Sequence, residues 1–495
     1  MKLPLDERAT GLVRRLAWVS LVVVLAWYYL FVVSAGRPGG SWWTYTSYYD
    51  YLAEGFRAGH LHLSVEPSAT LLAKANPTDP VHGKIWLWDA SFHNKHYYLY
   101  WGPVPALLLL AFKAVVRWSA PIGDQNLVLL FTALQLPLAA WLITATARRL
   151  FPRVRPWAMA LAVVVFGLAT PAPWLLARGA IYEAAIAAGQ LFLLGGVACA
   201  FEAVWRARRA APVWRWLLGA GLCWALALGS RLSLAPTIMV VGLGTVVAVR
   251  QVAGAKGWGG AVRGLAWVGA PIALALLALG AYNQARFGSW WETGVGNQLS
   301  TMKLRGSIRY VGPNLWSYLV RPVAMTCKFP WATSEWFLSG GAFPDWFKLP
   351  KDYWQHEPVS GLLLIVPWIY LTPLAFWGAA RRDNPAMVRL WVTGAFAALA
   401  VMPLLPALWM FIASMRYLAD VRTGVILLGT LGAFTWLERV ADKPRPRRIA
   451  AAVCVGLALV TVFFGVTLGF TGYFGHFQKS NPALWSRLQQ YGCPK

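Results

Sequence analysis

The stretch LAWVSLVVVLAWYYLFVVS, residues 16–34, decides the class of fold. Its 19 residues include no Asp, Glu, Lys or Arg. An α-helix needs roughly 20 apolar residues to cross the hydrocarbon layer of a membrane. The run is also longer than the apolar part of a secretory signal peptide. It therefore predicts an uncleaved helix that spans a membrane.

The remaining chain has the same character. Of its 495 residues 58% are hydrophobic and 13% are charged, and the mean hydropathy is +0.50. Long apolar runs at this composition are typical of integral membrane proteins. We expect an all-α integral membrane protein, because further apolar runs lie near residues 101–116, 126–147, 157–177, 184–204, 214–229, 234–250, 264–282, 360–380, 389–411, 421–438 and 449–471.

The net charge of +26 suggests what the chain contacts. The basic residues form short clusters between apolar runs, whereas a nucleic-acid-binding protein concentrates them in one patch. Basic loops between spans face the cytoplasm and its anionic lipids. Membrane lipids are therefore the predicted partner of this charge, and nucleic acid is not.

The basic clusters also predict the topology. If residues 101–116 crossed the membrane, the clusters at 148–155 and 206–215 would lie outside, against the positive-inside rule. This run is short for a span, and Pro103 and Pro105 open it. We therefore expect it to lie in the outer interface, which leaves about eleven spans, a cytoplasmic N-terminus and an external C-terminus.

This topology places two long segments outside the membrane. The first, about 35–125, belongs to an expected N-terminal module of residues 1–250. The second, about 283–359, belongs to a C-terminal module of residues 251–495. The loops on the cytoplasmic side are short and basic, so we expect any chemistry to face outward.

Three carboxylates near the outer membrane edge are the candidate catalytic groups. The stretch SYYDYLAEGFRAGHLHL, residues 47–63, predicts a short helix with Asp50 and Glu54 one turn apart. Glu183 begins the fourth span. A carboxylate within hydrogen-bond reach of an acceptor hydroxyl or amine can take its proton. Asp50 is the predicted base and Glu183 a helper, and Glu54 is the third candidate catalytic residue.

Arginines at the outer span ends are candidate phosphate ligands. Guanidinium groups bind phosphate bidentately and stabilise it as a leaving group. Ionisable residues at span ends are costly and usually have a function or a partner. The predicted substrate-binding residues are Arg178, Tyr182, Arg231, Arg286, Glu292, Arg416 and Tyr417.

A structural role is the alternative for several of these residues. Arg178 would pair with Glu183, and Arg416 with Asp420, which lies at the helical i, i+4 spacing. Glu292 would be an exposed loop acid and not part of an acceptor pocket.

Histidines and cysteines give no clear metal signature. His60 and His62 could join Asp50 or Glu54 around a metal, but no HExxH-like spacing supports this. The sequence indicates no cofactor with certainty. It leaves open whether the protein binds a divalent cation. The cysteines show no zinc spacing, whereas Cys327 and Cys493 both fall outside the predicted membrane and could form a disulfide.

Several motifs together resemble a known superfamily. They are YYDYLAEGFRAGHL (48–61), KHYYLYWGPVPALLLLAFKAV (95–115), LPLAAWLITATARRLFP (136–152) and ATPAPWLLARGAIYEAAIAAGQLF (169–192). This N-terminal plan resembles the GT-C superfamily of polytopic glycosyltransferases, which includes protein O-mannosyltransferases, the lipid A aminoarabinose transferase and the oligosaccharyltransferases. YNQARFGSWWETG (282–294) and MRYLADV (415–421) resemble stretches of the RgtA/B/C/D-like bacterial members.

The resemblance implies roles for two acids. Asp50 takes the position of the acidic residue in the first external loop that serves as base or metal contact, and Glu183 that of the second-loop acid. Many members have an Asp-Glu pair in the first loop, whereas Tyr51 follows Asp50 here.

The expected function is that of an inverting glycosyltransferase of the bacterial inner membrane. It would use a polyprenyl-phosphate-linked sugar to modify a lipid, glycan or protein of the envelope on the external, periplasmic face. Two alternatives from other classes are a lipid or sugar transporter or flippase, and a non-catalytic scaffold for envelope assembly. The sequence shows no internal repeat of the kind common in transporters.

Overall fold

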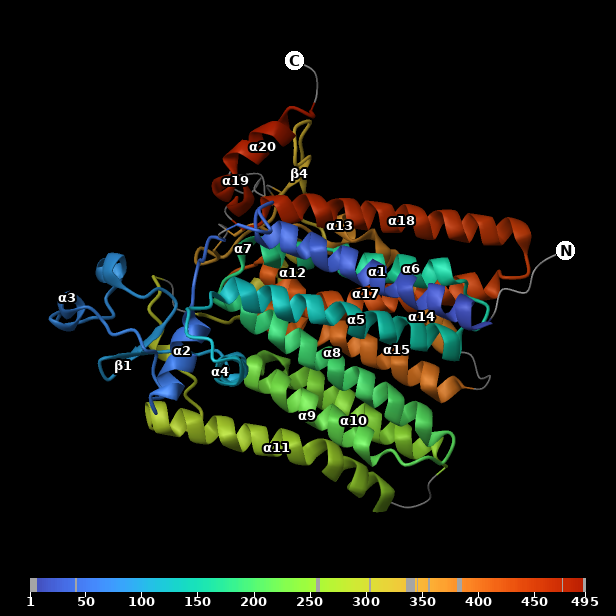
Figure 1. Cartoon of the computed structure of the whole chain (residues 1–495), viewed down its shortest axis with the longest axis horizontal. Helices are drawn as coiled ribbons and strands as arrows, with labels where there is room; N and C mark the ends of the chain where they lie inside the picture. Colours follow the sequence, from blue (N-terminus) through green and yellow to red (C-terminus); the bar gives the residue numbers. More distant parts are fainter. Residues whose placement is uncertain are drawn as a thin grey trace.

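The computed structural model describes residues 7–40, 42–254, 259–301, 304–334, 343–344, 346–354, 357–380, 385–473 and 475–492. Long helices run side by side across the molecule (Figure 1). Within these residues, nine helical segments are long and apolar enough to cross a membrane. They are Arg15–Val33 of α1 (Glu7–Val33), α5 (Asp124–Leu150), Pro156–Arg178 with α6 (Pro156–Leu168) and α7 (Ala172–Arg178), α8 (Ile181–Ala207), Leu232–Val252 with η2 (Leu232–Leu234) and α10 (Ala235–Val252), α11 (Gly259–Phe287), Ala386–Trp409 with α15 (Ala386–Val401) and α16 (Leu404–Trp409), α17 (Met415–Arg439) and α18 (Pro444–Thr471).

The predicted all-α, multi-pass membrane class is confirmed by these helices. Two of the predicted spans take another form. Residues 214–229 form α9 (Trp214–Ser230), a helix of 17 residues that packs between α8 and α11. Residues 360–380 divide into α13 (Leu362–Ile365), η6 (Pro367–Leu371) and α14 (Thr372–Ala379). Pro367 and Pro373 interrupt this run because proline cannot donate a backbone hydrogen bond.

The least apolar span lies at the centre. The mean hydropathy of the most apolar window of α17 is 1.3, the lowest of the nine, yet this window is entirely buried. Its charged side chains Arg416, Asp420 and Arg422 are buried within the protein. Charged groups are costly against lipid but can be paired inside a bundle. The helix that carries them therefore takes the innermost position.

The first long segment gathers at one end of the bundle. It contains α2 (Tyr48–Arg57), α3 (Ala69–Leu72), η1 (Pro80–Ile85), the hairpin of β1 (Ser91–His93) and β2 (His96–Tyr98), and α4 (Val104–Val116). Figure 1 shows these elements at the end opposite the N-terminus. With 13 residues, α4 is only about 20 Å long, too short to cross a bilayer. It packs against α2 and α9.

The second long segment closes over the same end. It contains η3 (Val295–Asn297), η4 (Ile308–Tyr310), α12 (Val311–Leu319) and the strand pair β3 (Ala324–Met325) and β4 (Ala332–Thr333). Ser91 and Gln298 form a backbone bridge between the two segments. The short helices α19 (His476–Ser480) and α20 (Pro482–Gln489) follow α18, at the end of the bundle away from the N-terminus (Figure 1).

Two predictions about organisation need separate comment. The division into modules 1–250 and 251–495 stays a prediction, and helices from both sides of it pack together, such as α8 with α17. Cys327 is disulfide-bonded, whereas Cys199, Cys223 and Cys454 are free. The predicted partner of Cys327, Cys493, lies outside the described residues.

Candidate active site

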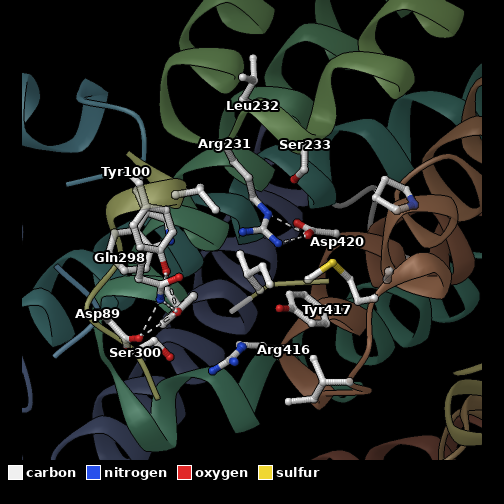
Figure 2. A pocket seen from close by; sticks show the side chains of 18 of the residues that line it. Asp89, Tyr100, Arg231, Leu232, Ser233, Gln298, Ser300, Arg416, Tyr417 and Asp420 are labelled. Carbon is white, nitrogen blue, oxygen red and sulfur yellow. Dashed lines mark hydrogen bonds and ion pairs between the residues drawn. The ribbon is translucent and has the colours of Figure 1, made fainter. Parts of the chain in front are cut away.

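A cavity of about 650 Å³ lies where both long segments meet the ends of the helices. Its walls combine residues of the first segment, the 293–304 stretch, and the ends of α7, α9, α16 and α17 (Figure 2). Five of the predicted substrate-binding residues line it: Arg178, Tyr182, Arg231, Arg416 and Tyr417. The structure thus brings together residues from four separate helix ends.

A tight turn places two of these residues beside each other. α7 ends at Arg178, and Gly179 follows with a φ of +55°, a conformation that glycine adopts without strain. A Cβ at Gly179 would lie 2.6 Å from the Cβ of Gln125, so a larger residue would clash there. α8 then starts at Ile181, and its second residue, Tyr182, lines the same cavity.

Each arginine of the cavity has one acidic partner. Arg178 lies 3.4 Å from Glu183, Arg231 lies 2.6 Å from Asp420, and Arg416 lies 2.9 Å from Glu357. The predicted pair of Arg178 with Glu183 is therefore present. Asp420 pairs with Arg231 and not with Arg416.

These ion pairs use only part of the hydrogen-bonding capacity of the guanidinium groups. A guanidinium group carries five N–H donors. The Nε atom of Arg416 is buried and has no hydrogen-bond partner among the described residues. The guanidinium groups also lie over aromatic rings, Arg416 at 4.3 Å from the centroid of Tyr182 and Arg178 at 4.6 Å from that of Tyr473. Such contacts hold a cation in place without using its donors.

Asp89 faces the arginines across the cavity, and it is not among the residues that the sequence predicts. Its carboxylate accepts hydrogen bonds from the hydroxyl of Tyr182 at 3.2 Å and from Nε2 of Gln298 at 3.0 Å. Tyr100 donates to Tyr182 at 2.6 Å and so extends this network. Figure 2 shows Asp89 on one side of the cavity, with Arg231 and Arg416 on other sides.

The backbone at Asp89 explains its exposure to the cavity. Its φ of +63° is a left-handed conformation, which aspartate tolerates better than most residues. The Asp89 amide donates to the carbonyl of Leu299, which joins the loop to the second segment. The only local sequence signal is a lone acid beside Trp86 and Trp88 in an irregular loop.

Asp50 and Glu54 lie elsewhere. Their positions one turn apart place both on the face of α2 that meets α4, where Lys113 Nζ lies 2.6 Å from Asp50 and 2.7 Å from Glu54. Glu54 also pairs with Arg57. Neither acid lines the cavity. The geometry therefore gives Asp50 a partner in the fold but no access to the candidate site.

The three remaining predicted residues do not line the cavity but lie close to residues that do. Glu183 is fully buried beside Arg178. Arg286 donates to the carbonyl of Leu99 and to Oδ1 of Asn283. The carboxylate of Glu292 accepts the backbone N–H of Gly294 at 2.6 Å and so shapes the loop next to the cavity. The sequence predicts these residues as part of the site. In the structure they do not line the cavity.

Among the described residues, the acids of the cavity do not converge as a group of three or more potential metal ligands. Asp420 and Glu357 are each paired with an arginine, and Asp89 is held by neutral donors. The three potential metal ligands that do converge in the described part of the chain are His62, Glu66 and His96, which lie outside this cavity.

No protein-family model matches the chain, and no curated protein matches it. Among solved structures it is similar to the apo oligosaccharyltransferase of Archaeoglobus fulgidus, with 11% identity and a TM-score of 0.47 over 92% of this chain. A structure of archaeal oligosaccharyltransferase AglB with an inhibitory peptide and a dolichol-phosphate gives the same values. The chain spans 56% of the length of these proteins. Oligosaccharyltransferases are among the proteins that the sequence motifs resemble.

Proposed function

We propose that this chain is a membrane glycosyltransferase that takes a sugar from a polyprenyl-phosphate donor and transfers it, with inversion, to an acceptor of the bacterial envelope. The observation that supports this is the Asp89 carboxylate facing a cavity that also holds three guanidinium groups. A base and several phosphate ligands in one cavity suit a reaction in which a nucleophile loses a proton while a phosphate leaves.

Asp89 is the proposed general base. It accepts the proton of an acceptor hydroxyl or amine while the oxygen or nitrogen forms a bond to the anomeric carbon. The bond from that carbon to the phosphate oxygen breaks, and its electron pair leaves with the phosphate. Hydrogen bonds from Tyr182 and Gln298 hold the carboxylate in its orientation.

Arg178, Arg231 and Arg416 are the proposed ligands of the leaving phosphate. Their acidic partners hold the guanidinium groups in place before a substrate binds. Donors that are already oriented need no rearrangement when charge develops on the phosphate, which makes their stabilisation more effective.

The proposed path of the polyprenyl chain follows the apolar wall of the cavity. Leu232, Pro403 and Pro406 line this wall. Leu232, Leu405 and Trp409 are about half exposed at the adjoining helix ends, where lipid would surround a spanning bundle. A lipid tail can lie there while its phosphate reaches the arginines.

A second cavity of about 770 Å³ suits the acceptor. It shares Val295, Gln298, Ser300, Thr301, Leu304 and Phe411 with the first cavity, so a molecule held there reaches the vicinity of Asp89. Its other lining includes Asn76, Asp79, Asn297, Asp352 and Trp354. Amides, carboxylates and an indole ring suit a hydroxylated acceptor such as a glycan.

The proposed location is the outer face of the bacterial inner membrane, with a cytoplasmic N-terminus. The basic loops support this orientation through the positive-inside rule. The acceptor then meets the donor on the periplasmic side.

The test compares lipid-linked sugars and envelope glycans by mass spectrometry in the wild type, a deletion strain and complemented strains. Complementation uses the wild-type chain, Asp89→Asn, Asp50→Asn and the control Asp442→Asn, an exposed acid that pairs with Arg153. We expect one lipid-linked sugar to accumulate and one decoration to disappear in the deletion strain and in the Asp89→Asn strain. The other complemented strains should resemble the wild type.

Other outcomes would point elsewhere. If the deletion changes the glycans but Asp89→Asn restores them, the chain acts as a transporter or scaffold, or uses another base. If Asp50→Asn alone reproduces the deletion, Asp50 is the base and the role of Asp89 is refuted. If the deletion changes nothing, the glycosyltransferase proposal fails.

A further inference from the structure

Histidines concentrate in one part of this chain. Five of its seven histidines lie between residues 60 and 96, in the first long segment. His60, His62 and His96 stack, with ring centroids 4.8 Å apart for the first pair and 4.2 Å for the second. The proposed transfer reaction uses none of them. The stack therefore needs an explanation of its own.

Three metal-binding side chains converge at this stack. One ligand atom from each of His62, Glu66 and His96 lies within 4.8 Å of the others. Nδ1 of His96 lies 3.4 Å from Oε2 of Glu66. In a tetrahedral zinc site with bonds of about 2.1 Å, neighbouring ligand atoms are about 3.4 Å apart. One edge of such a site is thus already formed, and His62 would close the others by turning out of its stack on His96.

The local hydrogen bonds favour ligation over solvation. Nδ1 of His62 lies 2.9 Å from the Leu63 carbonyl, so it donates there and leaves Nε2 with a free lone pair. Metal-bound histidines commonly donate their second N–H to a carbonyl in this way. Nδ1 of His96 is buried and makes no well-oriented hydrogen bond among the described residues, with Glu66 as its neighbour.

A backbone hydrogen bond fixes the positions of His62 and His96 relative to each other. The Leu63 amide donates to the Tyr97 carbonyl at 2.8 Å, which joins the segment after α2 to β2. His62 and His96 are the residues that immediately precede these two bonded positions. The β1–β2 hairpin follows directly after Asp89 and leads into Tyr100, and both of these residues line the first cavity.

We propose that His62, Glu66 and His96 bind a zinc ion on the outer side of the protein. Two imidazoles and a carboxylate are ligands that zinc prefers, and His60 or a water molecule completes the tetrahedron. The ion links the loop after α2 to the hairpin between Asp89 and Tyr100. Its role is structural, since it lies outside the cavity that holds Asp89.

The test uses the full chain, purified in detergent and freed of metal ions with EDTA. Zinc chloride is added, excess is removed by gel filtration, and bound zinc is measured by mass spectrometry. We expect one zinc per chain for the wild type and for the control His82→Gln, a histidine of the same segment outside the cluster. The double variant His62→Gln/His96→Gln should bind zinc at least about 100-fold more weakly.

Two further readouts keep the outcome clear. Cobalt in place of zinc should give the visible absorption of a tetrahedral site in the wild type and not in the double variant. Zinc should raise the Tm of the wild type by at least about 2 °C and leave the double variant unchanged, while both have equal Tm values in EDTA. Wild-type chain that binds no zinc, or a double variant that binds it equally well, would overturn the proposal.

Discussion

Nζ of Lys113 on α4 lies 2.6 Å from the Asp50 carboxylate on α2, and both side chains are 4% exposed. Glu54 is a second partner of the same ammonium group, at 2.7 Å. Burial by itself lowers the pKa of Lys113, but hydrogen bonds and charges from Asp50 and Glu54 raise it more, so the pKa lies above its usual value. This cluster joins α2 to α4, a helix too short to cross a membrane.

Lys113→Met should destabilise the protein by about 3 kcal/mol or more, because two carboxylates then face each other without a cation. Asp50→Asn should cost only about 1 kcal/mol, since Glu54 still pairs with Lys113. Thermal unfolding in detergent measures both effects. As far as the lysine itself titrates, its raised pKa makes its contribution complete below about pH 10.4, and this contribution is lost as the pH rises through the raised pKa of the folded state. Equal Tm values for the two variants would contradict the arrangement.

Asp89→Asn should lower the rate of sugar transfer by about 10²- to 10⁴-fold, because an amide cannot accept the proton of the acceptor. The donor for the assay is the lipid-linked sugar that accumulates in the deletion strain. Tyr182→Phe removes one hydrogen bond to Asp89 and should reduce the rate by a smaller factor. An unchanged Tm in both variants would show that the loss is chemical.

Arg231 and Asp420 allow the structural and the phosphate-binding roles to be separated. Arg231→Gln leaves a buried carboxylate without its cation and should destabilise the protein by about 3 kcal/mol. The double variant Arg231→Gln/Asp420→Asn should recover about 2 kcal/mol or more of this loss. Its transfer activity should stay low because one phosphate ligand is missing. A double variant with full activity would show that Arg231 serves only the fold.

His476 should make the protein sensitive to acid. Burial lowers the pKa of this histidine to about 4, and its ring lies beside Trp43 and Tyr45 outside the spanning helices. The folded chain therefore binds this proton less readily than the unfolded chain, whose histidine titrates near 6.5.

The contribution of His476 is complete above about pH 6.5 and is lost as the pH falls towards about 4, with a total of about 3 kcal/mol. Thermal unfolding at several pH values in this range measures it. His476→Phe keeps a ring in the same place without a titrating group, so its Tm should fall less with acid. If the Tm of the wild type and of His476→Phe falls equally with acid, other groups cause the acid sensitivity.

Much of the architecture follows from local sequence. The length and composition of an apolar run predict a spanning helix, since a bilayer selects on these properties alone. The short run that opens with Pro103 and Pro105 is indeed a 13-residue helix beside the bundle. The runs at 214–229 and 360–380 are the exceptions. The first forms a helix of 17 residues, and prolines divide the second into three short helices.

The candidate site could be predicted only in part. Arg178, Arg231 and Arg416 were recognisable because a charge at the end of a span is costly without a role. Asp89 was not, because it lies in an irregular loop whose place depends on the Leu299 backbone more than two hundred residues later. Helical spacing predicts that Asp50 and Glu54 share one face of a helix. It does not predict that Lys113 pairs with them.

The sequence alone thus determined which segments are helices, which of them are apolar enough for a membrane, and which charges stand at their ends. These are properties of short stretches, set by side-chain hydrophobicity and backbone periodicity. Only the tertiary structure decided which charges neutralise each other and which face a cavity. Asp50 is buried against Lys113, whereas Asp89 faces three arginines, because pairing of buried charges depends on contacts between segments far apart in the chain.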